Sequence, residues 1–418
     1  MTDKVSGRGG RLRIGPYELT QGEFSGAFAD LGVLIPLEAA LIAVNGINPT
    51  STLLGVGVAY IAAGWYFRLP MPVQPLKALA VIAIAQALSP AVIAAGALLM
   101  SLTMFTLAVT RGVEYLTRVV PMPVVRGVQF ALGITLIRNA LGMIFSKPFV
   151  IGGEEQRYVG LAGIDVSAGL LVGIGSLALL LLLLWRPWLP AAAVVALLGA
   201  LIGIAANWND AHFSMGPAQI SLMIPGGADL WVAFVTLVIP QIPLTLTNSV
   251  IATVDTARSY FGAGAQRVTP VRVSLSVALG NLWAGLAGGL PMCHGCGGLT
   301  AHYRLGGRTP ASTTLVGVLL IALAIFFGSS AQEVRSLMPY GALGALLMYV
   351  GVQHMQLGLD VNGIRNFSIV ALVGAVAATP FGNLAIGAGA GLAAYWGTAW
   401  VVSLNARQRR PANGTRRG

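Results

Sequence analysis

Long apolar runs separated by short polar segments make up most of this chain. A helix needs about 20 apolar residues to cross a membrane, and transporters also contain shorter runs broken by proline or glycine. A first series of spans is predicted near 24–44, 50–67, 72–88, 90–110, 124–146, 165–184 and 190–206. A second is predicted near 231–253, 271–290, 294–303, 310–329, 334–352, 366–379 and 382–403. The pattern predicts an all-α polytopic membrane protein with fourteen transmembrane segments.

Two series of seven also define the domain organisation. Seven is an odd number, so the second series must insert upside down relative to the first, and we predict an inverted repeat. The expected parts are an N-terminal segment at 1–23, a first repeat at 24–206, an external connection at 207–230, a second repeat at 231–403 and a basic tail at 404–418.

The basic residues agree with this arrangement, because Lys and Arg favour the cytoplasmic side of a membrane. With a cytoplasmic N-terminus, 20 of the 25 basic residues fall in cytoplasmic segments, and the stretch from Asn207 to Asp229 contains none. We therefore expect a multi-pass protein of the cytoplasmic (inner) membrane with both termini cytoplasmic. Residues 1–23 are polar and basic, which predicts no cleavable signal peptide.

Composition excludes several classes of protein. Hydrophobic residues make up 56% of the chain and charged residues 9%, against about 25% charged in an ordinary soluble domain. The formal charge of +11 comes from loops and chain ends, so it indicates topology and predicts no nucleic-acid partner. No Gly-x-x-x-x-Gly-Lys-Ser/Thr motif occurs, so hydrolysis of ATP by this chain is not expected.

The segment Leu69-Pro-Met-Pro-Val-Gln-Pro-Leu-Lys-Ala78 interrupts the third span. Its three prolines remove backbone donors and require an extended backbone. A short helix is expected to begin near Pro75, with Gln74 and Lys77 in or beside its first turn. A helix N-terminus carries free N–H groups and about half a positive charge. The segment therefore predicts an anion site.

A second interrupted segment, Gly289-Leu-Pro-Met-Cys-His-Gly-Cys-Gly-Gly-Leu-Thr-Ala-His302, lies in the tenth span. It combines a proline break with glycine-rich backbone and a short helix-like stretch. Paired interrupted segments at matching positions of two halves indicate a transporter's binding site. The contacts predicted from this segment are Cys293, His294, Gly295, Cys296, Gly297 and Gly298.

The charges of these two segments favour a dianion. Two helix N-termini supply about one positive charge between them, and a protonated Lys77 adds another. Two simpler interpretations stay open: the prolines could form an ordinary kink at a loop boundary, and Lys77 could snorkel to the membrane surface.

The Cys293-His-Gly-Cys296 sequence suggests a metal or redox site as an alternative. Tetrahedral zinc needs four ligands, however, and the remaining histidines offer no second pair. We therefore predict no metal and no cofactor. A membrane metalloenzyme or redox protein built on Cys293, His294 and Cys296 would instead contain bound metal when purified.

Polar residues inside two further spans are candidates for coupling or structure. Asp30 and Glu38 lie on nearly the same helix face of the first span and suit a coupling-ion site or a structural ion pair. Gln241, Thr245 and Asn248 share one face of the eighth span. Neutral donors suit an anion but also suit interhelical hydrogen bonds, and we favour Gln241 as a substrate contact.

Two motifs resemble a known family. Pro-x-Pro-Val-Gln-Pro-x-Lys-Ala at 70–78, and Pro-x-Cys-His-Gly-x-Gly-Gly-Leu at 291–299 followed by Tyr303, Gly306 and Arg308, closely resemble the signatures of the MOT1-type molybdate transporters, a branch related to the SulP sulfate permeases. Asp30-Leu-Gly with Pro36, and Pro240-Gln-x-Pro-Leu-Thr, are also similar to this family. Leu76 and Cys296 stand where its pattern usually has Met and Ala.

The resemblance implies the fold of the sulfate and nucleobase permeases, with half-helices at segments 3 and 10, substrate between them, and a core domain that moves against a gate domain. It implies no STAS domain, in agreement with the short tail, and a homodimer. The expected protein is not an enzyme but a secondary transporter of molybdate in a lipid bilayer, with proton or sodium open as coupling ion. A sulfate or tungstate carrier and a channel are the alternatives. The expected substrate contacts are Gln74, Pro75, Lys77, Gln241, Cys293, His294, Gly295, Cys296, Gly297 and Gly298.

Overall fold

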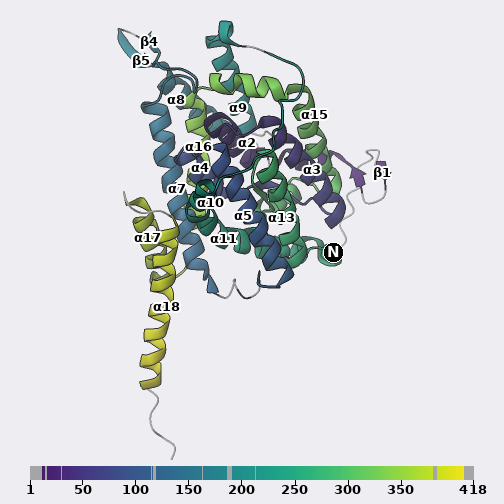
Figure 1. Ribbon diagram of the computed structural model, residues 1–418, viewed down its shortest axis with the longest axis vertical. Helices are drawn as coiled ribbons and strands as arrows, with labels where there is room; N and C mark the ends of the chain where they lie inside the picture. Colours follow the sequence, from purple (N-terminus) through teal and green to yellow (C-terminus); the bar gives the residue numbers. More distant parts are fainter. Residues whose placement is uncertain are drawn as a thin grey trace, which may run out of the picture.

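A computed structural model gives the fold. It describes residues 12–14, 17–29, 31–113, 115, 119–161, 163–185, 191–211, 213–379 and 384–408. Among these residues, seven helices are long and apolar enough to cross a membrane, and shorter apolar helices accompany them. The chain is therefore an all-α polytopic membrane protein (Figure 1).

Each predicted span contains at least one helix. In the first series these are α1 (Gln21–Ala29), α2 (Leu31–Ala40) and the π-helix η1 (Leu41–Asn45), followed by α3 (Pro49–Phe67), α4 (Lys77–Ala85), α5 (Pro90–Val109), α7 (Met122–Phe145), α8 (Ala168–Leu183) and α9 (Ala191–Ala206). In the second series they are α10 (Gly227–Ala233), η3 (Phe234–Val238), α11 (Ile239–Leu244), η4 (Thr245–Ile251) and α12 (Ala252–Phe261), followed by α13 (Pro270–Ala287), α14 (Cys296–Arg304), α15 (Pro310–Val334), α16 (Tyr340–Leu359), α17 (Ile364–Ala378) and α18 (Leu384–Gln408).

Short strands form three two-stranded sheets in the described residues. β1 (Leu12–Ile14) pairs with β2 (Tyr17–Leu19), and β4 (Tyr158–Leu161) pairs with β5 (Ile164–Ser167), both as local hairpins. The third sheet joins β3 (Gln74–Pro75) to β6 (Met292–Cys293), which lie far apart in the sequence. The three prolines predicted the extended backbone at β3, whereas the two hairpins were not predicted from the sequence.

Four helices begin with the same local signal. Asn48, Ser89, Thr269 and Thr309 each stand directly before a proline, and the side chain of each accepts a hydrogen bond from a backbone N–H of the first turn. Proline fits the first helical position because its missing N–H would have no partner there. The sequence therefore specifies the starts of α3, α5, α13 and α15 locally.

The eighth span is one continuous helical stretch with π-helical turns. Pro240 and Pro243 lie within α11 and cannot donate to the preceding turn. The flanking η3 and η4 widen the helix to π geometry, which often occurs at functional sites.

The helices form two groups that meet at α4. α7 packs against α16 and α17, whereas α3 packs against α15 and α5 against α13. Figure 1 shows α17 and α18 beside α7, on the side of the molecule away from α3 and α15. Close contacts use glycine, as membrane helices do: a Cβ on Gly57 would come within 2.8 Å of the Gly317 carbonyl oxygen.

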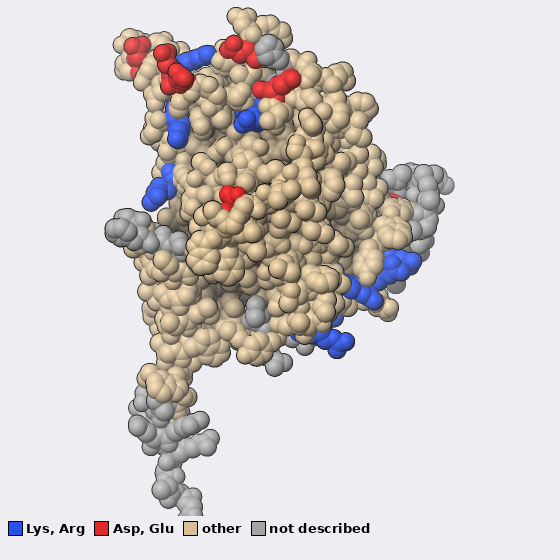
Figure 2. Space-filling view, viewed as in Figure 1, with Lys and Arg blue, Asp and Glu red and all other residues tan. Residues whose placement is uncertain are grey.

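The surface has the pattern expected for a membrane protein. Figure 2 shows most of the visible charged residues near the top of the view and further basic residues at its lower right, with largely uncharged surface between them. Acidic residues gather near β4 and β5.

Glu23 provides an unpredicted link between the first and eleventh spans. It is buried, and its carboxylate accepts hydrogen bonds from the backbone N–H groups of Arg308 (2.9 Å), Thr309 (2.9 Å) and Ser312 (3.1 Å). A carboxylate at a helix N-terminus satisfies free donors and the helix dipole. Glu23 therefore fixes α1 to the start of α15.

We predict that Glu23→Ala destabilises the protein by about 2 kcal/mol or more, because hydrogen bonds to a charged group are lost and buried donors remain. The measurement is unfolding of the detergent-solubilised protein followed by tryptophan fluorescence. Glu154→Ala, which changes an exposed carboxylate, is the control. Equal unfolding midpoints for the two variants would contradict the capping role.

Candidate anion-binding site

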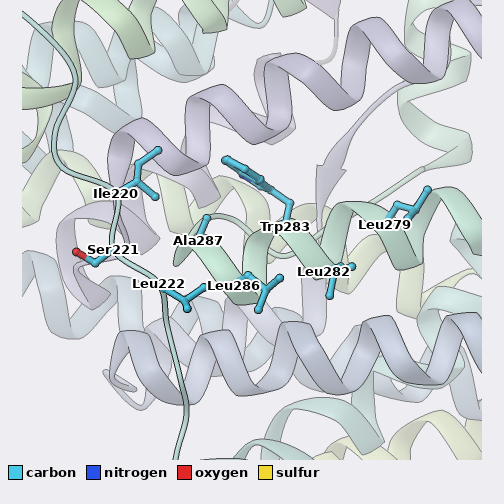
Figure 3. Close-up of a pocket in the computed structure, with 8 residues that line it drawn as sticks. All are labelled: Ile220, Ser221, Leu222, Leu279, Leu282, Trp283, Leu286 and Ala287. Carbon is cyan, nitrogen blue, oxygen red and sulfur yellow. The ribbon is translucent and has the colours of Figure 1, made fainter.

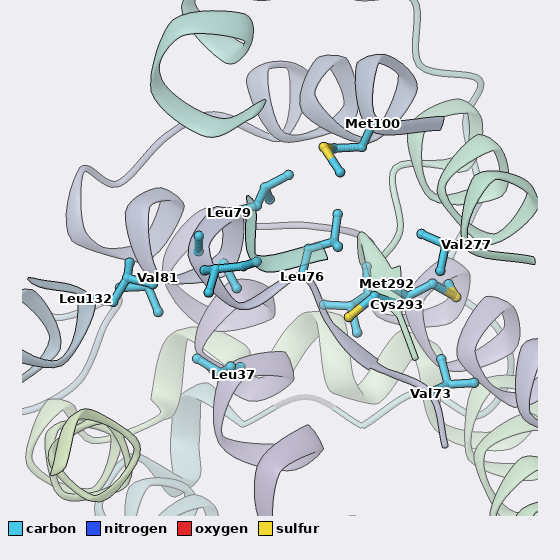
Figure 4. Close-up of a cluster of buried hydrophobic side chains, with 14 of the residues drawn as sticks. Leu37, Val73, Leu76, Leu79, Val81, Met100, Leu132, Val277, Met292 and Cys293 are labelled. Carbon is cyan, nitrogen blue, oxygen red and sulfur yellow. The ribbon is translucent and has the colours of Figure 1, made fainter. Parts of the chain in front are cut away.

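The two proline-broken segments meet as an antiparallel pair. Gln74 lies opposite Cys293 and Pro75 opposite Met292, and the Leu76 N–H donates to the Pro291 carbonyl at 2.9 Å. Figure 4 shows Leu76, Met292 and Cys293 together within a cluster of buried apolar side chains. The prolines prevent a helix here, and pairing satisfies the extended backbone that results.

Each strand is followed at once by a half-helix. α4 begins at Lys77 and α14 at Cys296. The N-cap residues, Leu76 and Gly295, make no side-chain hydrogen bond to the first turn of either helix. The backbone N–H groups of Lys77, Ala78, Cys296, Gly297 and Gly298 have no partner in another described segment. Two helix N-termini with free donors therefore lie on either side of the strand pair.

Gln241 provides a cap for α4 from another span. Its Oε1 accepts a hydrogen bond from the Leu79 N–H at 3.0 Å, and its Nε2 donates to Thr245 Oγ1 at 2.9 Å. Gln241 is 2% exposed. Gln241, a predicted substrate contact, thus lies at the N-terminus of α4. Its side-chain oxygen accepts from a backbone N–H to which a bound anion could also hydrogen-bond.

A small cavity of about 10 Å³ lies at this junction. Its described lining is Lys77, Gln129, Gln241, Leu244, Asn248, Ser249, Cys293 and His354. A volume of this size holds about one water molecule, so the conformation is closed around the site. Lys77 is half-buried and has no acidic partner among the described residues.

Gln129 of α7 and His354 of α16 were not predicted from the sequence. The Gln129 Oε1 accepts from Arg126 at 3.1 Å, and Arg126 also pairs with Asp360 at 3.0 Å. His354 is buried, its Nδ1 bonds the Val350 carbonyl at 2.9 Å, and its Nε2 has no partner among the described residues. A polar residue within an apolar span is a signal of function, and both positions carried that signal.

His294 lies behind the strand pair and is not among the residues that line the cavity. Its Nδ1 bonds the Pro72 carbonyl at 2.8 Å and its Nε2 bonds the Ser276 hydroxyl at 2.8 Å. A neutral ring has one donor and one acceptor, so these two partners use both. The geometry makes His294 a residue that holds the segment around Pro72 against β6.

Asn281 of α13 has a similar effect on β6. Its side-chain amide donates to the Met292 carbonyl at 2.6 Å and accepts from the Met292 N–H at 3.2 Å. The side-chain amide of Asn281 thus makes the two hydrogen bonds to Met292 that a residue of a neighbouring strand would make. This buried residue was not predicted.

Each cysteine thiol has a hydrogen-bond partner, and that of Cys293 is the Pro75 carbonyl at 3.7 Å. Cys293 lines the cavity, and the Cys296 thiol donates to Asn248 Oδ1 at 3.0 Å. No group of three His, Cys, Asp or Glu side chains that could hold a metal occurs in the described part of the chain.

Of the two candidate carboxylates in the first span, the structure describes only Glu38. Asp30 lies outside the described residues. Glu38 of α2 is 5% exposed, one of its oxygens has no partner among the described residues, and it does not line the cavity.

Comparisons with known proteins give the family. A model described as "Molybdate transporter of MFS superfamily" matches residues 22–136 and 233–353, more than half of the chain. Molybdate transporter 2 of Arabidopsis thaliana is 30% identical over 405 residues, which cover 89% of this chain and 86% of that protein. The chain belongs to the molybdate transporter family. It is therefore a transporter and not an enzyme, as the motifs predicted.

Further relatives have lower identity. Molybdate transporter 1 of Arabidopsis thaliana is 27% identical over 81% of this chain and 80% of its own length. A probable sulfate transporter of Mycobacterium tuberculosis is 26% identical over 72% of this chain and 52% of its own length.

Solved structures show the fold. The transmembrane domain of a cyanobacterial bicarbonate transporter, BicA, matches with a TM-score of 0.63 at 17% identity and covers 89% of this chain and 97% of its own. The murine solute carrier 26 family member A9 anion transporter, in an inward-facing state, matches with a TM-score of 0.65 at 15% identity and covers 93% and 70%. The predicted sulfate-permease-like fold is confirmed at this level.

A pair of glycines tests the strand junction. A Cβ on Gly295 would lie 2.3 Å from Gln74 Oε1, whereas a Cβ on Gly175 of α8 would meet nothing within 4 Å. We predict that Gly295→Ala abolishes transport and lowers the unfolding midpoint, because the added methyl group displaces the buried side chain of Gln74 at the junction. Gly175→Ala, the matched control outside the proposed site, should retain both properties. Transport assays in vesicles and thermal unfolding measure the difference, and equal behaviour of the two variants would exclude this role for the junction.

Proposed function

We propose that the protein is a secondary active transporter that carries molybdate across the cytoplasmic membrane by alternating access. One observation carries the proposal: two half-helix N-termini with free N–H groups flank one strand pair, and Lys77 lies at the first residue of one of them. Membership of the molybdate transporter family supports molybdate as the oxyanion.

The charge at this point suits a dianion. Each helix N-terminus contributes about half a positive charge, and a protonated Lys77 contributes one more. The backbone N–H groups that lack a partner can each donate to an oxyanion oxygen, and these hydrogen bonds offset part of the cost of removing the oxyanion from water. A dianion would therefore neutralise these positive charges, since Lys77 has no acidic partner among the described residues.

The proposed contacts follow from position. Backbone donors come from the first turns at Lys77, Ala78 and residues 296–298, and the Lys77 ammonium supplies the charge. Gln241 and Asn248 line the cavity from the eighth span, and Cys293 lines it from β6. Gln74, Pro75, His294 and Gly295 hold the two segments in place.

The proposed movement separates two helix groups. Gln129 and His354 reach the cavity from α7 and α16, whereas Lys77, Asn248 and Cys293 belong to α4, η4 and β6. A cavity with space for about one water molecule must open before an oxyanion enters. Rocking of α7 and α16 against the other group would open it.

Helix contacts support two inverted repeats of seven segments. In an inverted repeat, segment 2 corresponds to segment 9 and segment 4 to segment 11. If α3 (segment 2) packs against α15 (segment 11), then α13 (segment 9) should pack against α5 (segment 4). Both pairs are in contact. By the same correspondence, the contact of α7 with α17 matches that of α16 with α8. The contact of α8 with α9 matches that of α17 with α18, and all four pairs are in contact. The strand pair β3–β6 is exchanged with itself.

The coupling ion stays open between proton and sodium in this proposal. Glu38 is the candidate among described residues, because a buried carboxylate with a free oxygen suits either ion. A homodimer and cytoplasmic termini complete the proposal. A tungstate or sulfate carrier is the second candidate, supported by the similarity to a probable sulfate transporter.

We predict that Lys77→Ala weakens molybdate binding by about tenfold to a hundredfold, the scale of a hydrogen-bonded charge. Calorimetry on the purified protein measures the affinity, with sulfate and tungstate as competitors. Lys147→Ala removes an exposed charge and should leave binding unchanged. Unaltered affinity in Lys77→Ala would refute the site, and equal displacement by sulfate would refute the choice of molybdate.

Gln241→Glu separates substrate binding from folding. The carboxylate can still accept from the Leu79 N–H, and Lys77, which lines the same cavity, can pair with its charge, so the unfolding midpoint should be retained. It adds a negative charge beside the proposed dianion, and we expect at least about a tenfold loss of molybdate affinity. Gln241→Leu, which removes the cap, should lower the midpoint instead. Normal affinity in Gln241→Glu would place the substrate elsewhere.

A further inference from the structure

An apolar groove of about 760 Å³ runs between α3 and α13, away from the anion-binding site. One stripe of each helix lines it. Val58, Ala62 and Trp65 represent the α3 stripe, and Arg272, Ser276 and Gly280 the α13 stripe. The small residues keep the groove deep, and Trp65 is 65% exposed. The groove therefore faces the membrane.

The length of the groove matches one leaflet of a bilayer. From Arg272 to Trp283 the lining covers eleven helical steps, or about 17 Å at 1.5 Å per residue. The hydrocarbon core of a membrane is about 30 Å thick, so one leaflet is about half of that. One extended acyl chain has the shape and the length to occupy the groove.

Trp283 marks the far end of this stretch. Its indole N–H donates to the Ser51 carbonyl of α3 at 3.1 Å and so bridges the two helices. Beyond it a second apolar cavity of about 410 Å³ continues along α13. Ile220 and Leu222 line this cavity, and Leu222 lies beside Leu286 (Figure 3).

Charge at the near end specifies the headgroup. Arg272 is the only charged residue among the described residues that line the groove, and it is exposed. Arg267 reaches the same end, because its guanidinium donates to the Tyr66 carbonyl at 3.0 Å. Trp65 and Tyr66 are aromatic residues of the kind that lie at headgroup level. Two arginines beside an apolar groove complement a phosphate that carries an acyl chain.

We propose that this groove binds one anionic phospholipid, with an acyl chain between α3 and α13 and its phosphate at Arg272 and Arg267. The lipid would touch the wall that supports the anion-binding site, since Ser276 lines the groove and bonds His294 at 2.8 Å. The proposal does not depend on which oxyanion is transported.

Native mass spectrometry of the full-length protein tests it, with phosphatidylglycerol and phosphatidylcholine of identical acyl chains as probes. Wild type should retain phosphatidylglycerol in preference. Arg272→Gln should reduce this retention about fivefold, the equivalent of about 1 kcal/mol per basic residue near a lipid surface. Ala62→Phe should fill the groove and reduce the retention of both lipids.

Matched controls are Arg258→Gln, an exposed arginine outside the groove, and Ala393→Phe, an exposed alanine of α18. Both should retain lipid as wild type does, and the unfolding midpoint of each variant shows that it is folded. Equal retention of the two lipids by wild type would overturn the proposal. So would retention unchanged by Arg272→Gln and Ala62→Phe, or a change of oligomeric state in Ala62→Phe, which would make a second copy the occupant.

Discussion

Extended backbone in the middle of a membrane protein must find hydrogen-bond partners within the protein, because hydrocarbon offers none. The prolines around Pro72 and Pro291 create such backbone in two spans at once. Pairing β3 with β6 meets the requirement. Asn281 completes the pairing at Met292, and His294 completes it at Pro72. The positions of both half-helices depend on this junction.

The same constraint produces the proposed function. A helix that begins at mid-membrane leaves its first N–H groups without intrahelical partners, and an anion is the ligand that they favour. At α4 the Gln241 amide satisfies one of these groups in the closed conformation. The proposed anion-binding site is therefore the part of the junction that the protein's own backbone leaves unpaired.

The groove and the anion-binding site share one wall. α13 presents Ser276 and Gly280 to the groove and Asn281 to β6, and Ser276 also bonds His294. A helix is only about 10 Å across with its side chains, so α13 separates the groove from the strand junction by one layer of residues. The proposed lipid and the proposed oxyanion would therefore share a common set of side chains.

The sequence by itself determined the features that depend on residues close together along the chain. Apolar runs located the spans, Asn-Pro, Ser-Pro and Thr-Pro pairs specify four helix starts, and prolines located both interruptions. Lys77 and Gln241 could be identified because polar groups in apolar runs are costly. Tertiary structure decided what depends on distant partners: Glu23 caps α15, Gln129 and His354 reach the cavity, and His294 bonds Pro72 and Ser276 instead of lining it. Local patterns cannot specify such contacts, because a buried polar side chain bonds whichever group packing brings within about 3 Å.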